Sequence, residues 1–146
     1  MRKHFMLILA VALLAGCGGV DPNSPEGKRK AAFKRMLNLS EDLGGMVRGR
    51  IAFDEQQFAE KAALLDEVSR QPWQYFEEAS TAKTSAKDDV WQKKERFLEL
   101  ARELENTTAV LVESVKQQPV NTDTLGVRID VVEKACESCH QEFRVY

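Results

Sequence analysis

The chain has 146 residues, of which 43% are hydrophobic, 8% are aromatic and 30% are charged, with eight glycines and four prolines. This composition is typical of one compact globular domain and excludes a repetitive or largely disordered protein. The formal net charge at pH 7 is −2, and because nucleic-acid phosphates bind cationic surfaces, neither DNA nor RNA is an expected partner.

Residues 1–16 are predicted to be a signal peptide that is cleaved before Cys17. Arg2 and Lys3 precede an apolar run at residues 5–14, which is too short to cross a membrane as a helix. The mature protein is therefore expected to be exported to the periplasm. Removal of these two basic residues leaves 19 basic against 23 acidic side chains, a formal charge of −4.

The residues around the cleavage site, Leu14-Ala15-Gly16-Cys17, are similar to the lipobox of bacterial lipoproteins. The cysteine sulfur of that motif carries a diacylglycerol, so acyl chains on Cys17 are expected to anchor the protein to a bacterial membrane. Residues 17–27 are rich in Gly, Pro and Ser and are predicted to be a flexible tether. The alternative is an ordinary secretory signal that leaves a soluble periplasmic protein.

Two amphipathic helices are predicted next. The first begins with Ser24 as the cap and Pro25 at the first helical position. The second begins at Asp54, where Gln57 completes a capping box, and it ends before Pro72. Their apolar residues recur at helical spacing: Phe33, Met36, Leu37, Leu43, Met46 and Val47 in the first helix, and Phe58, Ala62, Leu65 and Val68 in the second.

A polar connection at residues 72–87 follows the second helix. It starts with Trp73, Tyr75 and Phe76, which are expected to cover one end of the core. A third helix is predicted at about residues 88–118, because its apolar residues are spaced three or four positions apart, as in a helix packed in a bundle. These positions are Phe97, Ala101, Leu104, Thr108, Leu111 and Val115.

A fourth helix is predicted from Thr122 or Asp123 to the end of the chain. Its apolar face is Leu125, Ile129, Val132, Cys136, Cys139 and Phe143. Four amphipathic helices with connections of modest length bury their apolar faces best as an antiparallel bundle. The predicted fold is therefore all-α, a four-helix bundle over residues 28–146, with a cofactor site between the first and fourth helices.

The fourth helix carries Cys136-Glu-Ser-Cys139-His140, and C-x-x-C-H is the spacing by which haem c is attached to a chain. Each thiol forms a thioether with a haem vinyl group, and the histidine becomes an axial ligand of the iron. Because residues three and four apart share one helical face, both sulfurs and the imidazole can reach a single porphyrin. The sequence therefore predicts one covalent haem c.

Two other uses of the cysteines are disfavoured. A zinc site takes about four ligands, and outside the motif the chain offers only Cys17 and the signal-peptide His4. A thioredoxin-type C-x-x-C lies where a strand meets the start of a helix, whereas this motif lies near the end of one. With one thiol assigned to lipid and two to haem, no thiol remains for a disulfide.

The chain resembles the cytochromes c′, which are exported four-helix bundles ending in C-x-x-C-H-x-x-[FY]-R. Residues 136–144, Cys-Glu-Ser-Cys-His-Gln-Glu-Phe-Arg, match this ending. Further likenesses occur in order at residues 29–36, 46–49, 53–54, 72–76 and 84–91. The resemblance implies reversible binding of nitric oxide to ferrous haem and a homodimer formed through the first two helices.

The resemblance also implies roles for individual residues. Arg29 and Lys30 match positions at the haem edge, where a cation can pair with a propionate, and the alternative for either is a solvated surface charge. Thr84 matches a haem-edge contact from the connection after the second helix. Arg144 matches a residue on the proximal face beside His140, and its alternative role is to complement the dipole at the end of the helix.

The distal axial position departs from the commonest pattern of the family. The register of the resemblance places Phe33 where many relatives carry leucine and where low-spin relatives carry a ligating methionine. A phenyl ring has no lone pair, so His140 is expected to be the only protein ligand of a five-coordinate, high-spin iron. The crowded, apolar distal pocket is then expected to admit neutral nitric oxide and carbon monoxide more readily than water or anions.

The alternative is a low-spin, six-coordinate cytochrome that only transfers electrons to and from periplasmic redox partners. In that case Phe33 is simply a core aromatic, and Met36 or another side chain takes the sixth position. Because no acid, base or hydroxyl group is identifiable near the distal face, no enzymatic activity is expected.

Overall fold

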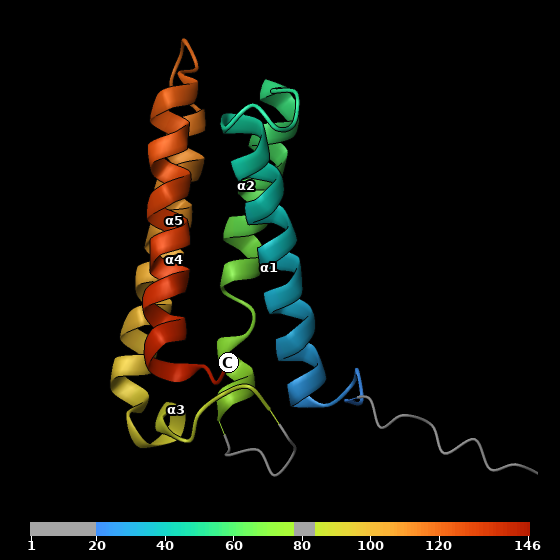
Figure 1. Cartoon of the computed structure of the whole chain (residues 1–146), viewed down its shortest axis with the longest axis vertical. Coiled ribbons are helices and arrows are strands. Elements are labelled where there is room, and N and C mark those ends of the chain that lie inside the picture. The colour runs from blue at the N-terminus through green and yellow to red at the C-terminus, as the bar shows by residue number, and fades with distance from the viewer. Residues whose placement is uncertain (1–19, 78–83) are drawn as a thin grey trace, which may run out of the picture.

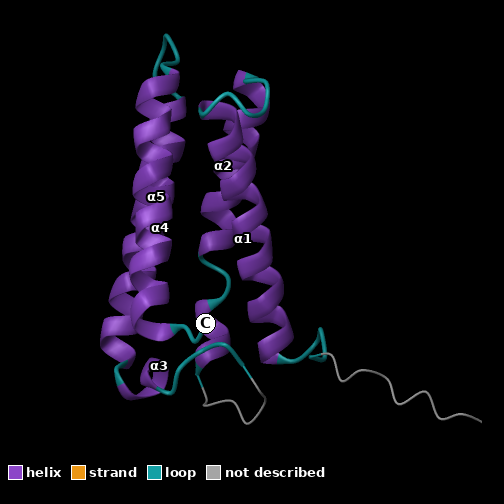
Figure 2. Cartoon of the chain, viewed as in Figure 1, coloured by secondary structure: helices purple, strands orange, loops and turns teal. Residues whose placement is uncertain are grey.

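The computed structural model describes residues 20–77 and 84–146. Four long helices run alternately up and down the molecule (Figure 1): α1 (Pro25–Val47), α2 (Glu55–Ser69), α4 (Lys94–Val115) and α5 (Thr122–Phe143). A short 3-10 helix, η1 (Trp73–Phe76), and a short helix, α3 (Asp89–Gln92), lie in the connection between α2 and α4. The described part of the chain consists of helices and loops (Figure 2). The predicted all-α antiparallel bundle is confirmed.

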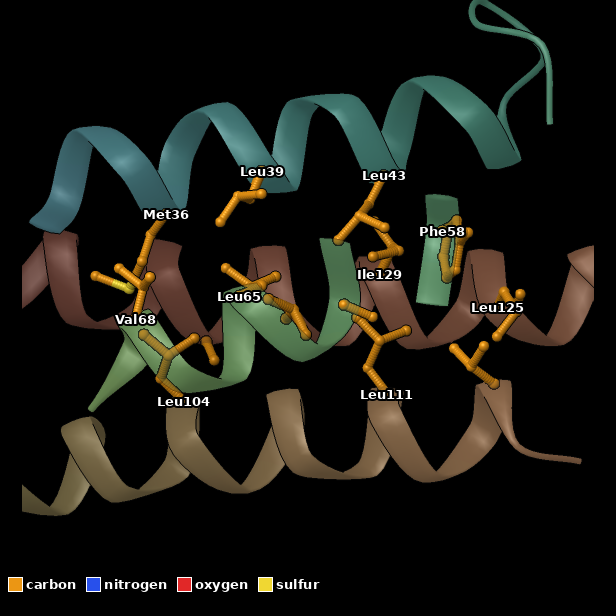
Figure 3. Close-up of a cluster of buried hydrophobic side chains, with 14 of the residues drawn as sticks. Met36, Leu39, Leu43, Phe58, Leu65, Val68, Leu104, Leu111, Leu125 and Ile129 are labelled. Atoms are coloured by element: carbon orange, nitrogen blue, oxygen red, sulfur yellow. The ribbon is translucent and has the colours of Figure 1, made fainter. Parts of the chain in front are cut away.

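Each long helix packs against two others, α1 and α4 both lying against α2 and α5. Their apolar faces meet in a cluster along the middle of the bundle (Figure 3), which includes Leu43, Phe58, Leu111 and Ile129 with no exposed surface. Burial of these faces is the main source of stability for a bundle whose helices would be marginal in isolation. None of the helices in the described ranges is long and apolar enough to cross a membrane.

The start of the first helix shortens the predicted tether. The signal peptide and Cys17 lie outside the described residues, but α1 begins at Pro25, so residues 25–27 are helical and not part of a tether. Ser24 caps the helix by accepting a hydrogen bond from the Gly27 amide (3.1 Å). Residues 21–24 fold back so closely that a Cβ at Gly27 would collide with the Asp21 carbonyl oxygen. Glycine is required there by this close approach.

The predicted starts of the second and fourth helices are confirmed by their caps. The Asp54 carboxylate accepts a hydrogen bond from the Gln57 amide (2.8 Å), and the Asn121 side chain accepts one from the Thr124 amide (2.9 Å). At the start of α2 the Phe53 ring packs against Phe58, with 5.5 Å between the ring centroids. This contact fixes the angle at which the chain enters the helix.

The predicted start of a helix at about residue 88 is confirmed, because α3 begins at Asp89, but the prediction of one continuous helix as far as residue 118 is wrong. Lys93, with φ −115° and ψ 43°, leaves the helical region and separates α3 from α4. The bend allows Val90 on α3 and Phe97 on α4 to join the same apolar cluster. At the other end α4 stops at Val115, before Pro119, whose ring disfavours helical backbone in the residue that precedes it.

A buried polar contact joins α2 to α4 within this core. The Thr108 hydroxyl has no exposed surface, donates to the Asp66 carboxylate (2.8 Å) and lies 3.2 Å from the Ser69 hydroxyl. Ser69 is also fully buried and donates to the Asp66 carbonyl (2.8 Å). These bonds satisfy polar groups that would otherwise be costly to bury.

Replacement Thr108→Val is therefore expected to lower the free energy of unfolding by about 1–3 kcal/mol, because it removes the buried hydrogen bond to the Asp66 carboxylate and the contact with the Ser69 hydroxyl. The measurement is chemical denaturation of the holoprotein, followed by circular dichroism. The matched control is Thr107→Val, whose hydroxyl bonds only the Leu104 carbonyl of its own helix. Equal free energies of unfolding for the two variants would contradict the stabilising role of the Thr108 hydroxyl.

Candidate functional site

The last turns of α5 bring Cys136, Cys139 and His140 together. Because these residues are three and four apart on one helix, their side chains lie on the same face. All three are half-buried, while Glu137 and Gln141 on the other side of the helix are exposed. The two cysteines and the histidine of the C-x-x-C-H motif therefore point toward the packed side of the bundle, as the helical spacing predicts.

The two cysteines lie at the boundary between two apolar clusters. The first is the cluster along the middle of the bundle, and Cys136 packs against it. The second lies at the end of the bundle beside α3, and Cys139 packs against it. The second cluster consists of Phe76, Val90, Phe97, Leu100 and Phe143. The motif therefore faces an apolar region contributed by α1, η1, α4 and α5.

Phe33 on α1 and Trp73 on η1 pack against both clusters and so connect them. The Phe33 ring meets Trp73 edge-on at 5.8 Å between ring centroids and Phe76 at 6.3 Å. Edge-to-face pairs of this kind are favourable and define the orientation of each ring. Phe33 therefore lies on the same apolar region as the cysteines, held in place by neighbouring aromatic rings.

Arg29 is buried, which its position among the cations of α1 does not reveal. Only 4% of the residue is exposed, and its guanidinium lies 4.4 Å above the Phe76 ring. Nη1 donates to the Tyr75 carbonyl (2.6 Å), whereas Nη2 lies 3.7 Å from the Glu26 carboxylate. Burial lowers the pKa of Arg29, and the Glu26 charge partly offsets that effect. Arg29 therefore places a buried positive charge beside the aromatic rings of η1, at one end of the bundle.

The other predicted edge residues, Lys30 and Thr84, and the predicted proximal residue, Arg144, lie in different surroundings. Lys30 is exposed on the outer surface of α1. Thr84 is half-buried, and its hydroxyl accepts a hydrogen bond from the Ala86 amide (3.3 Å). Arg144 is exposed, and its amide donates to the His140 carbonyl (3.0 Å) at the end of α5. The structure thus gathers Arg29 and Phe33 at the apolar region but leaves Lys30 outside it.

The segment after Thr84 is attached to the end of α5 by backbone pairing. The Lys87 amide donates to the Phe143 carbonyl (2.9 Å), and the Val145 amide donates to the Ser85 carbonyl (2.8 Å). These bonds form an isolated antiparallel bridge between Ala86 and Arg144. Sequence patterns did not predict this pairing, because a bridge this short carries no alternation of apolar and polar residues. It holds the connection against the turn that follows His140.

An ion network between the end of α1 and the turns of α5 that precede the motif was also not predicted. Arg48, at the end of α1, donates to Glu133 (2.9 and 2.7 Å) and to Asp130 (2.6 Å) on α5. The guanidinium passes so close to Gly44 that a Cβ there would touch Nη1. Both carboxylates lie on the helix that carries the motif, one or two turns before Cys136. The network therefore fixes the position of α5 relative to α1.

The electrostatic surroundings keep the motif uncharged. Burial raises the pKa of Cys136 to about 11, with the Glu133 charge adding to the effect. Burial, Cys136 and Glu142 likewise raise the pKa of Cys139 to about 11. Burial lowers the pKa of His140, and the nearby Arg144 cation lowers it further. The imidazole therefore remains neutral at pH 7, the form that binds a metal ion.

Within the described residues, no group of three or more His, Cys, Asp or Glu side chains is placed to hold a metal ion. Two thiols and one neutral imidazole on one helical face instead suit a large planar group that bonds to all three. The comparison with known proteins identifies that group.

The family model for cytochrome c′ matches residues 25–144. The chain belongs to the cytochrome c′ family. It is 29% identical to cytochrome c′ of Halomonas halodenitrificans, over 85% of this chain and 98% of that protein. It is 24% identical to cytochrome c′ of Rhodopseudomonas palustris, over 99% of this chain and 97% of that protein.

Solved structures of cytochromes c′ share the fold. Cytochrome c′ from Shewanella frigidimarina has a TM-score of 0.79 at 22% identity, with 88% of this chain and 100% of that chain covered. A variant of cytochrome c′ from Alcaligenes xylosoxidans, solved as its nitric oxide complex, has a TM-score of 0.75 at 20% identity and covers 85% of this chain and 98% of that chain. Proteins of the cytochrome c′ family bind haem c covalently.

The residues of the site fit this cofactor. The apolar boundary between the two clusters suits a porphyrin face. Trp73 Nε1 and Arg29 Nη2 are buried and have no hydrogen-bond partner in the described residues. A buried donor without a partner costs about 1–3 kcal/mol, and the carboxylates of a bound haem would supply acceptors at this edge. The unpartnered donors, the two thiols and the imidazole therefore all fit a bound haem c.

Alkylation of the haem-free, folded chain is expected to be slow at Cys136 and Cys139. A pKa raised from about 9 to about 11 lowers the thiolate fraction at pH 8 by ~100-fold, and the thiolate is the reactive form. The rates should rise steadily as the pH is increased toward 11. The measurement is iodoacetamide labelling followed by mass spectrometry, with the same chain unfolded in urea as the control. Equal rates in both states would contradict the burial of the thiols.

Proposed function

We propose that this protein is an exported c-type cytochrome that binds nitric oxide at a five-coordinate haem iron. The observation that carries the proposal is the placement of Cys136, Cys139 and His140 on one face of α5, at the apolar boundary that Phe33 also occupies. In this proposal both cysteine sulfurs form thioethers, and the neutral His140 imidazole is the single axial ligand from the protein. The bound haem supplies the redox-active iron to which a diatomic gas can bond.

Phe33 is the residue proposed to guard the distal face. Its ring has no lone pair, so it occupies space over the porphyrin without completing the coordination of the iron. The rings of Trp73 and Phe76 meet it edge-on and keep it in place. Surroundings of this kind offer no hydrogen bonds to water or anions, which favours neutral nitric oxide and carbon monoxide. The nitric oxide complex of the Alcaligenes xylosoxidans relative supports the proposal.

The position of Met36 supports an open distal face over the six-coordinate alternative. Met36 is 6% exposed and its side chain lies in the central core beside Val68 (Figure 3). Withdrawing its thioether to ligate an iron would leave a void in that core, and filled cores resist such rearrangement. Electron exchange with periplasmic partners is the second candidate function. It uses the same iron but does not require a vacant position.

Arg144 and Arg29 are proposed to set the charge around the site. Burial lowers the pKa of His140, and the Arg144 cation lowers it further, so that the imidazole stays neutral, which favours ligation. The buried Arg29 guanidinium is proposed to pair with a haem carboxylate, because Nη2 has no hydrogen-bond partner in the described residues. Thr84 remains a proposed edge contact, reached from the connection before α3, whereas Lys30 is exposed on the outer surface of α1 and is not proposed to contact the haem.

Substitution Phe33→Ala is expected to accelerate binding of carbon monoxide and nitric oxide to the ferrous holoprotein by about tenfold or more, since removing the ring opens the distal face. Stopped-flow absorption measures the association rate. Phe53→Ala is the matched control, because Phe53 is also half-buried but packs against Phe58 at the start of α2. An unchanged rate in Phe33→Ala would show that this ring does not gate the site.

We further propose that the mature protein faces the periplasm and is anchored to a membrane by acyl chains on Cys17. This assignment rests on the apolar run at residues 5–14 and the sequence Leu14-Ala15-Gly16-Cys17. The first residue that the structure describes, Val20, is exposed, as expected for a segment leading away from the bundle.

Mass spectrometry of the mature N-terminus tests the anchor. We expect the chain to begin at Cys17 and to carry the added mass of acyl chains, and Cys17→Ser is expected to remove that mass. An N-terminus at any other residue, or an unmodified Cys17, would contradict the anchor while leaving the proposed haem site unaffected.

A further inference from the structure

The first half of α1 concentrates positive charge in an acidic protein. Between Gly27 and Ser40 the sequence contains Lys28, Arg29, Lys30, Lys34 and Arg35 and no Asp or Glu, although the whole chain has a net charge of −2. Arg29 is buried at the candidate site, as described above. The other four cations are exposed, and we call this set, Lys28, Lys30, Lys34 and Arg35, the cationic face of α1.

The charges of this face are not compensated by the protein. Within residues 20–77 and 84–146, Lys30, Lys34 and Arg35 form no ion pair, and Lys28 contacts only the Tyr75 ring, at 5.6 Å from its centroid. Many cations elsewhere are paired, for example Arg48 with Asp130 and Glu133, Lys61 with Asp42, Arg70 with Asp66 and Lys134 with Glu137. An unpaired group of like charges raises the local potential and favours an anionic partner.

An exposed apolar side chain lies within the same face. Leu37 is 57% exposed, and it follows Lys34 by three residues and Lys30 by seven, so the three share one stripe of the helix. Lys28 and Arg35 lie farther around the exposed half of the helix. Cations beside an exposed leucine are typical of helices that lie on a membrane surface, where the charges meet lipid headgroups and the apolar side chain enters the boundary.

The location of the face suits contact with the membrane that holds the proposed anchor. The chain from Cys17 to Ser24 can span at most roughly 25 Å, and α1 begins immediately after Ser24. Lys28 and Lys30 lie in the first turns of the helix. An acylated Cys17 therefore keeps this face close to the lipid headgroups, where electrostatic attraction acts over about 10 Å at moderate ionic strength.

We propose that the cationic face of α1 is a docking surface for the anionic phospholipid of the anchoring membrane. The lipid phosphates pair with Lys28, Lys30, Lys34 and Arg35, and Leu37 enters the headgroup boundary. Docking lays α1 against the bilayer and gives the tethered bundle a defined orientation. The orientation rests on the proposed anchor, whereas the affinity for anionic lipid is a property of the helix face alone.

Vesicle sedimentation of the holoprotein with Cys17→Ser, exported with an ordinary cleavable signal, tests the face without acyl chains. The probes are vesicles of phosphatidylcholine alone and of phosphatidylcholine mixed with phosphatidylglycerol, at low and at physiological salt. We expect binding only to the mixed vesicles, with weaker binding at higher salt. The variant Lys28→Gln, Lys34→Gln, Arg35→Gln should reduce the partition coefficient at least about tenfold, since each cation contributes roughly a fivefold factor.

The control variant is Arg50→Gln, Lys94→Gln, Arg102→Gln, which removes the same charge from exposed positions outside the face. Equal losses in both variants would show general attraction of cations to the vesicle and would overturn the proposal. Absence of binding to the mixed vesicles would also overturn it and would favour an acidic protein partner. A changed sedimentation coefficient in the face variant would identify an interface between subunits instead.

The haem spectrum is recorded on the same preparations, and the mass of the mature N-terminus is measured on the native chain. An unchanged spectrum with no vesicle binding means that only the docking surface fails. A missing haem means that the proposed haem site fails, and an unmodified Cys17 in the native chain means that the proposed anchor fails, each independently of the vesicle result.

Discussion

The arrangement of the site depends on the register of one helix. The end of α5 must turn two sulfurs and an imidazole toward the same apolar region, while its earlier turns bury Leu125, Ile129 and Val132 in the central core. A rotation that exposed the motif would also expose these side chains, at a cost of several kcal/mol. The haem-attachment motif is therefore positioned by the same apolar stripe that folds the bundle, and the ion network of Arg48 adds a second constraint from α1.

The aromatic end of the bundle combines packing with charge. Phe33, Trp73 and Phe76 form a set of edge-to-face rings, and Arg29 lies against the last of them. Burial favours the neutral forms of the thiols and the imidazole, and among the described residues it leaves Arg29 Nη2, Trp73 Nε1 and Trp91 Nε1 without a hydrogen-bond partner. Thiols with raised pKa values are poor nucleophiles.

Much of the fold followed from local sequence signals, since caps, prolines and apolar spacing act within a few residues. Ser24, Asp54 and the residues near Asn121 therefore marked the helix starts correctly. The break at Lys93 could not be predicted in the same way, because it results from Val90 and Phe97 packing into one cluster with Phe76 and Phe143, which are distant in sequence. A periodic pattern describes one helix at a time and cannot include that contact.

In the candidate site, too, features set by local spacing were predicted and features set by long-range contacts were not. The face shared by Cys136, Cys139 and His140 is a property of helical spacing and was predicted. The burial of Arg29 and the exposure of Lys30 were not, because neighbouring cations on one helix are distinguished only by the element that packs beside them, here η1. The pairing of Arg48 with Glu133 joins residues far apart in the chain, and no local signal identifies it.

The central claim is that His140 is the only side chain bound to the iron and that the opposite face is vacant. Electron paramagnetic resonance of the ferric holoprotein, recorded together with its absorption spectrum, tests this claim most directly. The proposed coordination predicts a high-spin ferric signal and an added nitrosyl spectrum when the ferrous protein is exposed to nitric oxide. A low-spin ferric signal with a methionine charge-transfer band would contradict it.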